Sequence, residues 1–149
     1  MTNLINILLV EDDEVDIMNV QRAFRKNKIS NPLYVVNNGL EALDALLGRQ
    51  PGAEIPSPGI ILLDINMPKM GGIEFLVELR KQPALKSISV FVMTTSNEES
   101  DKVAAYNLNV AGYILKPLSF EGFANAVATL SAYWHLCEMP VRMPNDQHV

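Results

Sequence analysis

Short apolar runs alternate with longer amphipathic segments along most of this chain, and this alternation constrains the fold more than any other feature. The short runs have the length and composition of buried strands, and they occupy residues 5–10, 33–36, 60–63, 90–93 and 112–115. The longer segments carry apolar residues at helical spacing, which predicts helices at 15–27, 39–47, 73–79, 98–107 and 120–133. Apolar strands joined by helical crossovers predict an α/β fold with a doubly wound, five-stranded parallel sheet covered on both faces.

Two segments lie outside this repeat. Residues 48–58 are rich in Pro and Gly and predict a long loop, and the tail from Pro140 to Val149 has no strand or helix pattern. A chain of 149 residues suits one domain. We therefore expect one domain at 4–132, followed at 133–149 by an extension that contributes a dimer contact and then a flexible tail.

Composition excludes several classes of protein. The hydrophobic fraction is 48% and the charged fraction 19%, which favours a folded core over disorder. The net charge is −5 without a run of Lys and Arg, so nucleic-acid binding is not expected. No apolar stretch approaches the ~20 residues of a membrane span, and the N-terminus lacks the basic region of a signal peptide. The expected location is the cytoplasm. The lone Cys137 excludes an internal disulfide.

Polar side chains follow four of the predicted strands at the point where each strand ends. Glu11 and Asp12 follow the first strand, Asp64 the third, Thr94 the fourth and Lys116 the fifth. The carboxyl ends of parallel strands meet at one sheet edge, where ligands of such folds bind. Clustered carboxylates suit Mg²⁺, and a carboxylate can act as a nucleophile toward phosphorus. The ammonium and hydroxyl groups could then stabilise transferring phosphoryl oxygens.

Four segments resemble the motifs of bacterial receiver domains, the phosphate-accepting modules of two-component signalling systems. They are Leu8–Asp12, Leu63–Gly72, Met93–Ser96 and Gly112–Pro117. Each motif alone is weak, but the four occur in the right order and each lies at a strand end. The resemblance covers roughly residues 4–132 and implies a flavodoxin-like receiver fold, (βα)5, with a C-terminal extension.

The resemblance also implies roles for individual residues. Asp64 would accept the phosphoryl group and become 4-aspartylphosphate, with Thr94 and Lys116 contacting the phosphoryl oxygens. Mg²⁺, or Mn²⁺ in its place, would bind the carboxylates of Asp12 and Asp64 and the backbone carbonyl of Asn66, and Glu11 would contribute through a bound water. These roles describe a signalling module that catalyses only its own phosphorylation and dephosphorylation.

The resemblance extends to a conformational switch. Tyr113 would turn inward when Thr94 moves toward the phosphoryl group, which would reshape the face formed by the fourth helix, fifth strand and fifth helix. The Lys116–Pro117 bond would be cis. Thr95 stands where a small Ala is frequent, and Asp13 adds an acid beside the usual pair, so both leave the lifetime of the phosphoaspartate open.

The long loop at 48–58, the Thr94–Ser96 segment and the extension Tyr133–Pro140 resemble the small regulators of cyanobacterial and bacterial phytochromes. Those proteins are single-domain receivers that carry no DNA-binding output domain. This implies a phytochrome-type histidine kinase as partner. It also implies a homodimer through the fourth helix, fifth strand, fifth helix and extension, and we expect Phe91, Tyr113 and Trp134 to leave apolar surface there.

The same residues also fit less specific roles and two rival functions. Asp13 is expected to cap the first helix and Ser96 the fourth, and Tyr113 could be only a packing residue. A haloacid-dehalogenase-type phosphatase also uses an Asp nucleophile, Mg²⁺ and a Lys, but it places Asp-x-Asp after its first strand, where this chain has Glu11–Glu14. A pseudo-receiver that binds proteins without taking phosphate is the second rival, which the intact set of polar residues disfavours.

Overall fold

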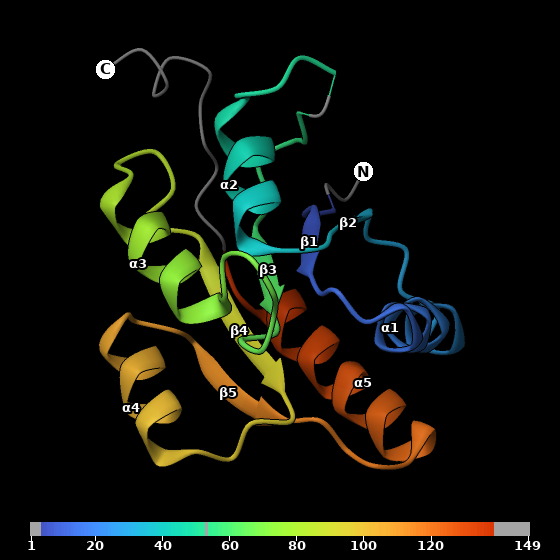
Figure 1. Cartoon of the computed structure of the whole chain (residues 1–149). Coiled ribbons are helices and arrows are strands. Elements are labelled where there is room, and N and C mark those ends of the chain that lie inside the picture. Colours follow the sequence, from blue (N-terminus) through green and yellow to red (C-terminus); the bar gives the residue numbers. More distant parts are fainter. Residues whose placement is uncertain (1–3, 53, 139–149) are drawn as a thin grey trace.

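The computed structural model describes residues 4–52 and 54–138. Strands and helices alternate along these residues in the predicted order (Figure 1). The strands are β1 (Ile7–Val10), β2 (Leu33–Val36), β3 (Ile60–Leu63), β4 (Ser89–Thr94) and β5 (Gly112–Leu115). The helices are α1 (Glu14–Lys26), α2 (Gly39–Leu47), α3 (Gly72–Lys81), α4 (Glu99–Asn107) and α5 (Phe120–Leu136).

The strands of the described residues form one parallel sheet in the order β2-β1-β3-β4-β5. The order reverses between β1 and β3, which is the switch point where ligands of doubly wound sheets bind. In the register, Val10 pairs with Leu63 and Thr94 with Leu115, so β1 and β3 end together, as do β4 and β5. The residues that follow these strands therefore meet at one edge. This confirms the predicted fold class.

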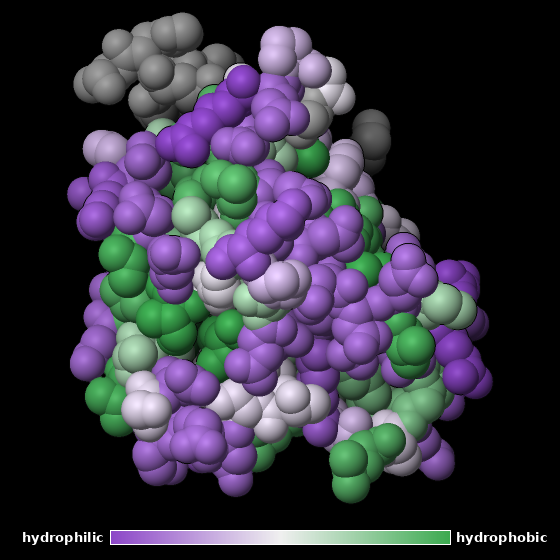
Figure 2. All heavy atoms as spheres, in the orientation of Figure 1, coloured by the Kyte–Doolittle hydropathy of each residue, from purple (hydrophilic) through white to green (hydrophobic). Residues whose placement is uncertain are grey.

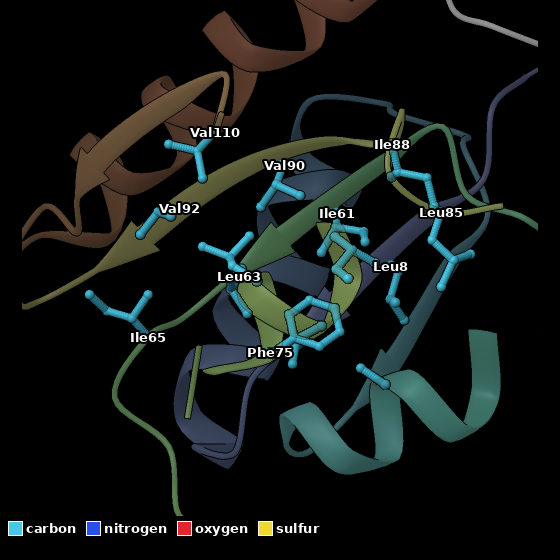
Figure 3. Close-up of a cluster of buried hydrophobic side chains, with 14 of the residues drawn as sticks. Leu8, Ile61, Leu63, Ile65, Phe75, Leu85, Ile88, Val90, Val92 and Val110 are labelled. Atoms are coloured by element: carbon cyan, nitrogen blue, oxygen red, sulfur yellow. The ribbon is translucent and has the colours of Figure 1, made fainter. Parts of the chain in front are cut away.

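Helices cover both faces of the sheet and create two hydrophobic clusters. Helices α2, α3 and α4 pack on one face and α1 and α5 on the other (Figure 1). The first cluster centres on Phe75 of α3, which is fully buried; Figure 3 shows it gathered with side chains of β3 and β4. The second contains Phe24 of α1 and Trp134 of α5, whose rings lie 6.1 Å apart. Both clusters hold the strands in place beneath the polar edge.

Arg80 of α3 joins three parts of the backbone. Its Nε donates to the carbonyl of Leu108 at 2.8 Å, and its Nη2 donates to that of Asn109 at 3.0 Å. Nη1 donates to the carbonyls of Lys86 and Ile88 at 2.9 Å each. The planar guanidinium can satisfy several acceptors at once. It thereby fixes the end of α4 to α3 and to the start of β4.

The expected apolar dimer surface needs correction. Phe91 and Trp134 are buried, at 5% and 3% exposure, because α5 runs to Leu136 and packs both against the sheet and α1. Tyr113 is half-buried. The extension predicted from residue 133 thus begins inside α5, and residues 139–149, including the predicted tail, lie outside the described part. None of the helices in the described residues has both the length and the apolar character needed to cross a bilayer.

Candidate functional site

The polar edge of the sheet brings together side chains from three strand ends and one helix. Glu11 follows β1, Asp64 follows β3, Lys116 follows β5, and Asp16 lies in the first turn of α1. Lys116 Nζ donates to Glu11 Oε1 and Asp16 Oδ2 at 2.7 Å each, and to Asp64 Oδ2 at 3.1 Å. One ammonium is thus shared by three carboxylates.

Asp64 is buried, and three donors surround its carboxylate. Thr94 Oγ1 donates to Oδ1 at 2.7 Å, the backbone N–H of Asn66 donates to Oδ1 at 3.1 Å, and Lys116 contacts Oδ2. Burial by itself would raise the pKa of Asp64, but the hydrogen bonds from Thr94 and Asn66 and the charge of Lys116 outweigh it and lower the pKa. Asp64 is therefore ionised at neutral pH, the form required of a nucleophile.

Glu11 has the opposite tendency. Its side chain is buried beside Asp64, and burial raises the pKa of Glu11 from 4.5 to about 7, with a further contribution from the negative charge of Asp64. The hydrogen bond from Lys116 opposes the rise without cancelling it. For Lys116, burial disfavours the charged form, but the bonds to Asp16 and Glu11 outweigh burial and raise the pKa. The site thus holds a permanent cation, an ionised Asp64 and a readily protonated Glu11.

An open cavity of about 540 Å³ gives solvent access to this cluster. Apart from Val15, its lining is charged or polar and comes from α1 and from the residues that follow the strands: Asp12, Asp13, Glu14, Val15, Asp16, Asp64, Asn66, Thr95 and Lys116. Asp12 is exposed at its rim. Asp13 caps α1, because its Oδ1 accepts from the N–H groups of Val15 and Asp16 at 2.8 and 3.1 Å. The prediction that Asp13 is a cap is confirmed.

The donor set fits a hard divalent cation. Carboxylate oxygens of Glu11, Asp16 and Asp64 lie within 4.8 Å of one another, and the predicted ligands Asp12 and Asn66 line the same cavity. Oxygen ligands with room for water suit Mg²⁺ and Mn²⁺. The sequence prediction missed Asp16. Its contact with Lys116 joins the first turn of α1 to the end of β5, and no local sequence pattern signals a contact between residues 100 positions apart.

A hydrogen-bonded path leads from Asp64 toward α4. The backbone N–H of Ser96 donates to Thr94 Oγ1 at 3.3 Å, and Tyr113 Oη donates to the Ser96 carbonyl at 2.9 Å. Ser96 Oγ donates to Asp101 Oδ2 at 2.6 Å. Tyr113 also packs against the first cluster, so it has the packing role that the sequence left open.

Two expectations are wrong: that Ser96 caps α4, and that the Lys116–Pro117 bond is cis. Glu98 is the N-cap of α4, without a side-chain hydrogen bond. Ser96 lies two residues earlier, and its Oγ accepts from the Glu98 N–H at 3.4 Å instead of capping the helix. No peptide bond among the described residues is cis, so Lys116–Pro117 is trans, the isomer favoured by about 0.5–1 kcal/mol even before proline.

The fold and this edge define a receiver module. A family model described as the response regulator receiver domain matches residues 7–128, and the chain belongs to that family. Such domains are signalling modules and not classical enzymes.

The chain is also similar to individual regulatory proteins. Response regulator Rcp1 of Synechocystis is 37% identical over 128 residues, which cover 86% of this chain and 87% of Rcp1. The probable methanogenesis regulatory protein FilR2 of Methanothrix harundinacea is 36% identical, with 86% and 82% covered. The crystal structure of phosphorylated RcpA, a cyanobacterial phytochrome response regulator, has a TM-score of 0.87 at 33% identity, covering 93% of this chain and all of that one. The Mn²⁺-bound form of Rcp1 has a TM-score of 0.84 at 35% identity, covering 92% and 99%.

Proposed function

We propose that this protein is a response regulator that accepts a phosphoryl group on Asp64 from a histidine kinase, in a Mg²⁺-dependent reaction, and signals through protein contacts. The observation that carries the proposal is the geometry around Asp64. An ionised carboxylate faces an open cavity, with an ammonium on one oxygen and a hydroxyl and an N–H on the other. The chain spans 87% of Rcp1, so the likeness is to that protein as a whole.

In the proposed reaction, an Asp64 oxygen bonds to the phosphorus of a phosphohistidine. The P–N bond breaks, its electron pair stays on the imidazole, and the product is an acyl phosphate. Lys116 and Thr94 supply a charge and a hydrogen bond to the phosphoryl oxygens. Asp12 and Asp64, the Asn66 carbonyl and, through water, Glu11 would hold Mg²⁺, which adds positive charge at those oxygens. The Mn²⁺-bound form of the relative Rcp1 supports the proposal that a divalent cation binds.

The proposed output follows from the bond between Thr94 and Asp64. When Thr94 turns its hydroxyl toward the phosphoryl group, it withdraws the acceptor that now binds the Ser96 N–H. Ser96 in turn contacts both Tyr113 and Asp101 of α4. A change at Asp64 would therefore reach Tyr113 and the first turn of α4.

The proposed kinase is a phytochrome-type light sensor. The relative RcpA is a phytochrome response regulator, and it is similar to this chain over its whole length. FilR2, which is named for methanogenesis, is nearly as identical as Rcp1. The kinase class is therefore a separate proposal, and its test is transfer of phosphate from a purified phytochrome kinase.

We also propose a homodimer that uses α4, β5, α5 and the extension. Phe91 and Trp134 are buried, but other apolar side chains on these elements are exposed. They are Val103, Tyr106, Leu115, Tyr133 and Leu136. Figure 2 shows hydrophobic side chains at the surface over α3 and α4. Exposed apolar groups gathered on neighbouring elements are typical of interfaces.

The test of the function is the intact mass after incubation with acetyl phosphate and Mg²⁺. We expect a gain of one phosphoryl group that EDTA abolishes and that Asp64→Asn does not show. Because Asn is nearly isosteric, circular dichroism should find this variant folded. Stable label on Asp64→Asn would refute the acceptor. If neither acetyl phosphate nor a phytochrome kinase labels the folded wild type, the protein is a protein-binding scaffold.

A further inference from the structure

Asp16 contacts the site cation although no role was predicted for it. Its Oδ2 accepts from Lys116 Nζ at 2.7 Å, which is shorter than the 3.1 Å between Lys116 and Asp64. We propose that Asp16 is a positioning residue that restrains Lys116 and so slows phosphorylation of Asp64. This inference rests on the proposed function, which makes Asp64 the acceptor.

The hydrogen-bonding capacity of Lys116 is fully used in this structure. An ammonium has three protons, and here they are matched by Glu11, Asp16 and Asp64. A phosphoryl oxygen arriving at Asp64 can receive a hydrogen bond from Lys116 only if one of these contacts is released or shared. Asp16 and Glu11 therefore compete with the phosphoryl group for the same cation.

Burial determines which of the two carboxylates, Asp16 or Glu11, loses its contact with Lys116 when the phosphoryl group arrives. The side chain of Glu11 is 3% exposed and that of Asp16 is 30% exposed. A released Asp16 carboxylate can be hydrated, whereas a released Glu11 side chain would stay buried, and it would have to take up a proton or remain as an unpaired buried charge. Asp16 is thus the partner that Lys116 releases during phosphorylation. The Lys116–Asp16 ion pair must break first, which slows the reaction.

The local backbone holds Asp16 in this position. Its N–H is bound by Oδ1 of the cap residue Asp13 at 3.1 Å, which fixes the first turn of α1 beside the cavity. The carboxylate therefore meets Lys116 from a rigid helix and not from a loop. The same position leaves another possibility, because Asp16, Glu11 and Asp64 could together hold a cation. The experiment separates the two roles.

The experiment measures the rate of labelling by acetyl phosphate at saturating Mg²⁺, in five variants beside the wild type. In this reaction an Asp64 oxygen bonds to phosphorus and acetate leaves with the electron pair of the broken P–O bond. We expect Asp16→Asn to be labelled about threefold faster, the effect of removing one partly exposed ion pair. Asp16→Glu, which keeps the carboxylate, should return toward the wild-type rate.

Three further variants test whether the effect passes through Lys116: Lys116→Met, Lys116→Met combined with Asp16→Asn, and Glu14→Gln. In a Lys116→Met background, Asp16→Asn should change the rate by less than about 1.5-fold, because the restrained cation is gone. Glu14→Gln is the matched control. Glu14 is exposed in the same helical turn and lines the same cavity, so this variant removes equal charge without removing a bond to Lys116. It should leave the rate unchanged.

The outcomes are distinct. Equal rates for Asp16→Asn and the wild type, or the same acceleration in Glu14→Gln or in the Lys116→Met background, would overturn the positioning role alone. Slower labelling together with a roughly tenfold weaker Mg²⁺ affinity by calorimetry would make Asp16 a metal ligand and also overturn it. A wild type that takes no phosphate would overturn the proposed function, and this inference with it.

Discussion

The hydroxyl of Thr94 donates a 2.7 Å hydrogen bond to Asp64 Oδ1, and both side chains are buried at the end of the sheet. Thr94→Val keeps the shape but removes this donor, so we expect the free energy of unfolding at pH 7 to fall by about 1–3 kcal/mol. The pKa of Asp64 should rise, because the bond favours its ionised form. Urea unfolding and NMR titration check both. The exposed neighbour gives a control, Thr95→Val, which should stay within about 0.5 kcal/mol of the wild type.

The raised pKa of Glu11 predicts a pH-dependent stability. Glu11 has a pKa of about 7 when folded and 4.5 by itself, so between these values the folded state binds a proton that the unfolded state does not. Stability from this group is therefore fully present below pH 4.5 and is lost as the pH rises through about 7. Relative to Glu11→Gln, the metal-free wild type should lose about 1 kcal/mol between about pH 6 and pH 8. Parallel urea midpoints for the two proteins would contradict the raised pKa.

Gly72 is expected to tolerate no side chain. A Cβ there would lie 2.4 Å from Ile65 Cα and 2.9 Å from the Asp64 carbonyl oxygen, so Gly72→Ala must displace the backbone that carries the acceptor. We expect a loss of about 3 kcal/mol in unfolding free energy and slower labelling of Asp64. The adjacent Gly71→Ala is the matched control, because its Cβ would meet its nearest neighbour at 3.6 Å and should cost less than about 1 kcal/mol.

The proposed dimer predicts a specific dissociating variant. Val103 and Tyr106 are 57% and 53% exposed on α4, and Val103→Lys combined with Tyr106→Glu would place charges in the proposed interface. Sedimentation velocity at tens of micromolar should give a dimer for the wild type and a monomer for the double variant. Leu118→Glu, which changes a fully exposed residue outside these elements, should remain dimeric. A monomeric wild type would refute the dimer.

The strands and the polar edge were predictable because continuous apolar runs stop where polar residues begin. The bounds predicted for β2, β3 and β5 agree with the structure. Asp16 was not found, because its contact with Lys116 depends on how α1 packs in the fold against α5, which its local sequence does not encode. The burial of Phe91 and Trp134 was missed for a similar reason, since apolar character does not say which side chains a longer α5 will cover.

The four hydrogen bonds of Arg80 determine how α4 can move. They hold the backbone after its C-terminal end, at Leu108 and Asn109, against α3 and the start of β4. The opposite end is tied to the site through Ser96 and Asp101. A displacement of α4 that kept the Arg80 contacts would be a rotation about Leu108, at the end of the helix opposite to Asp101. A shift of Ser96 would then move the first turn of α4, which holds Asp101, more than its last turn.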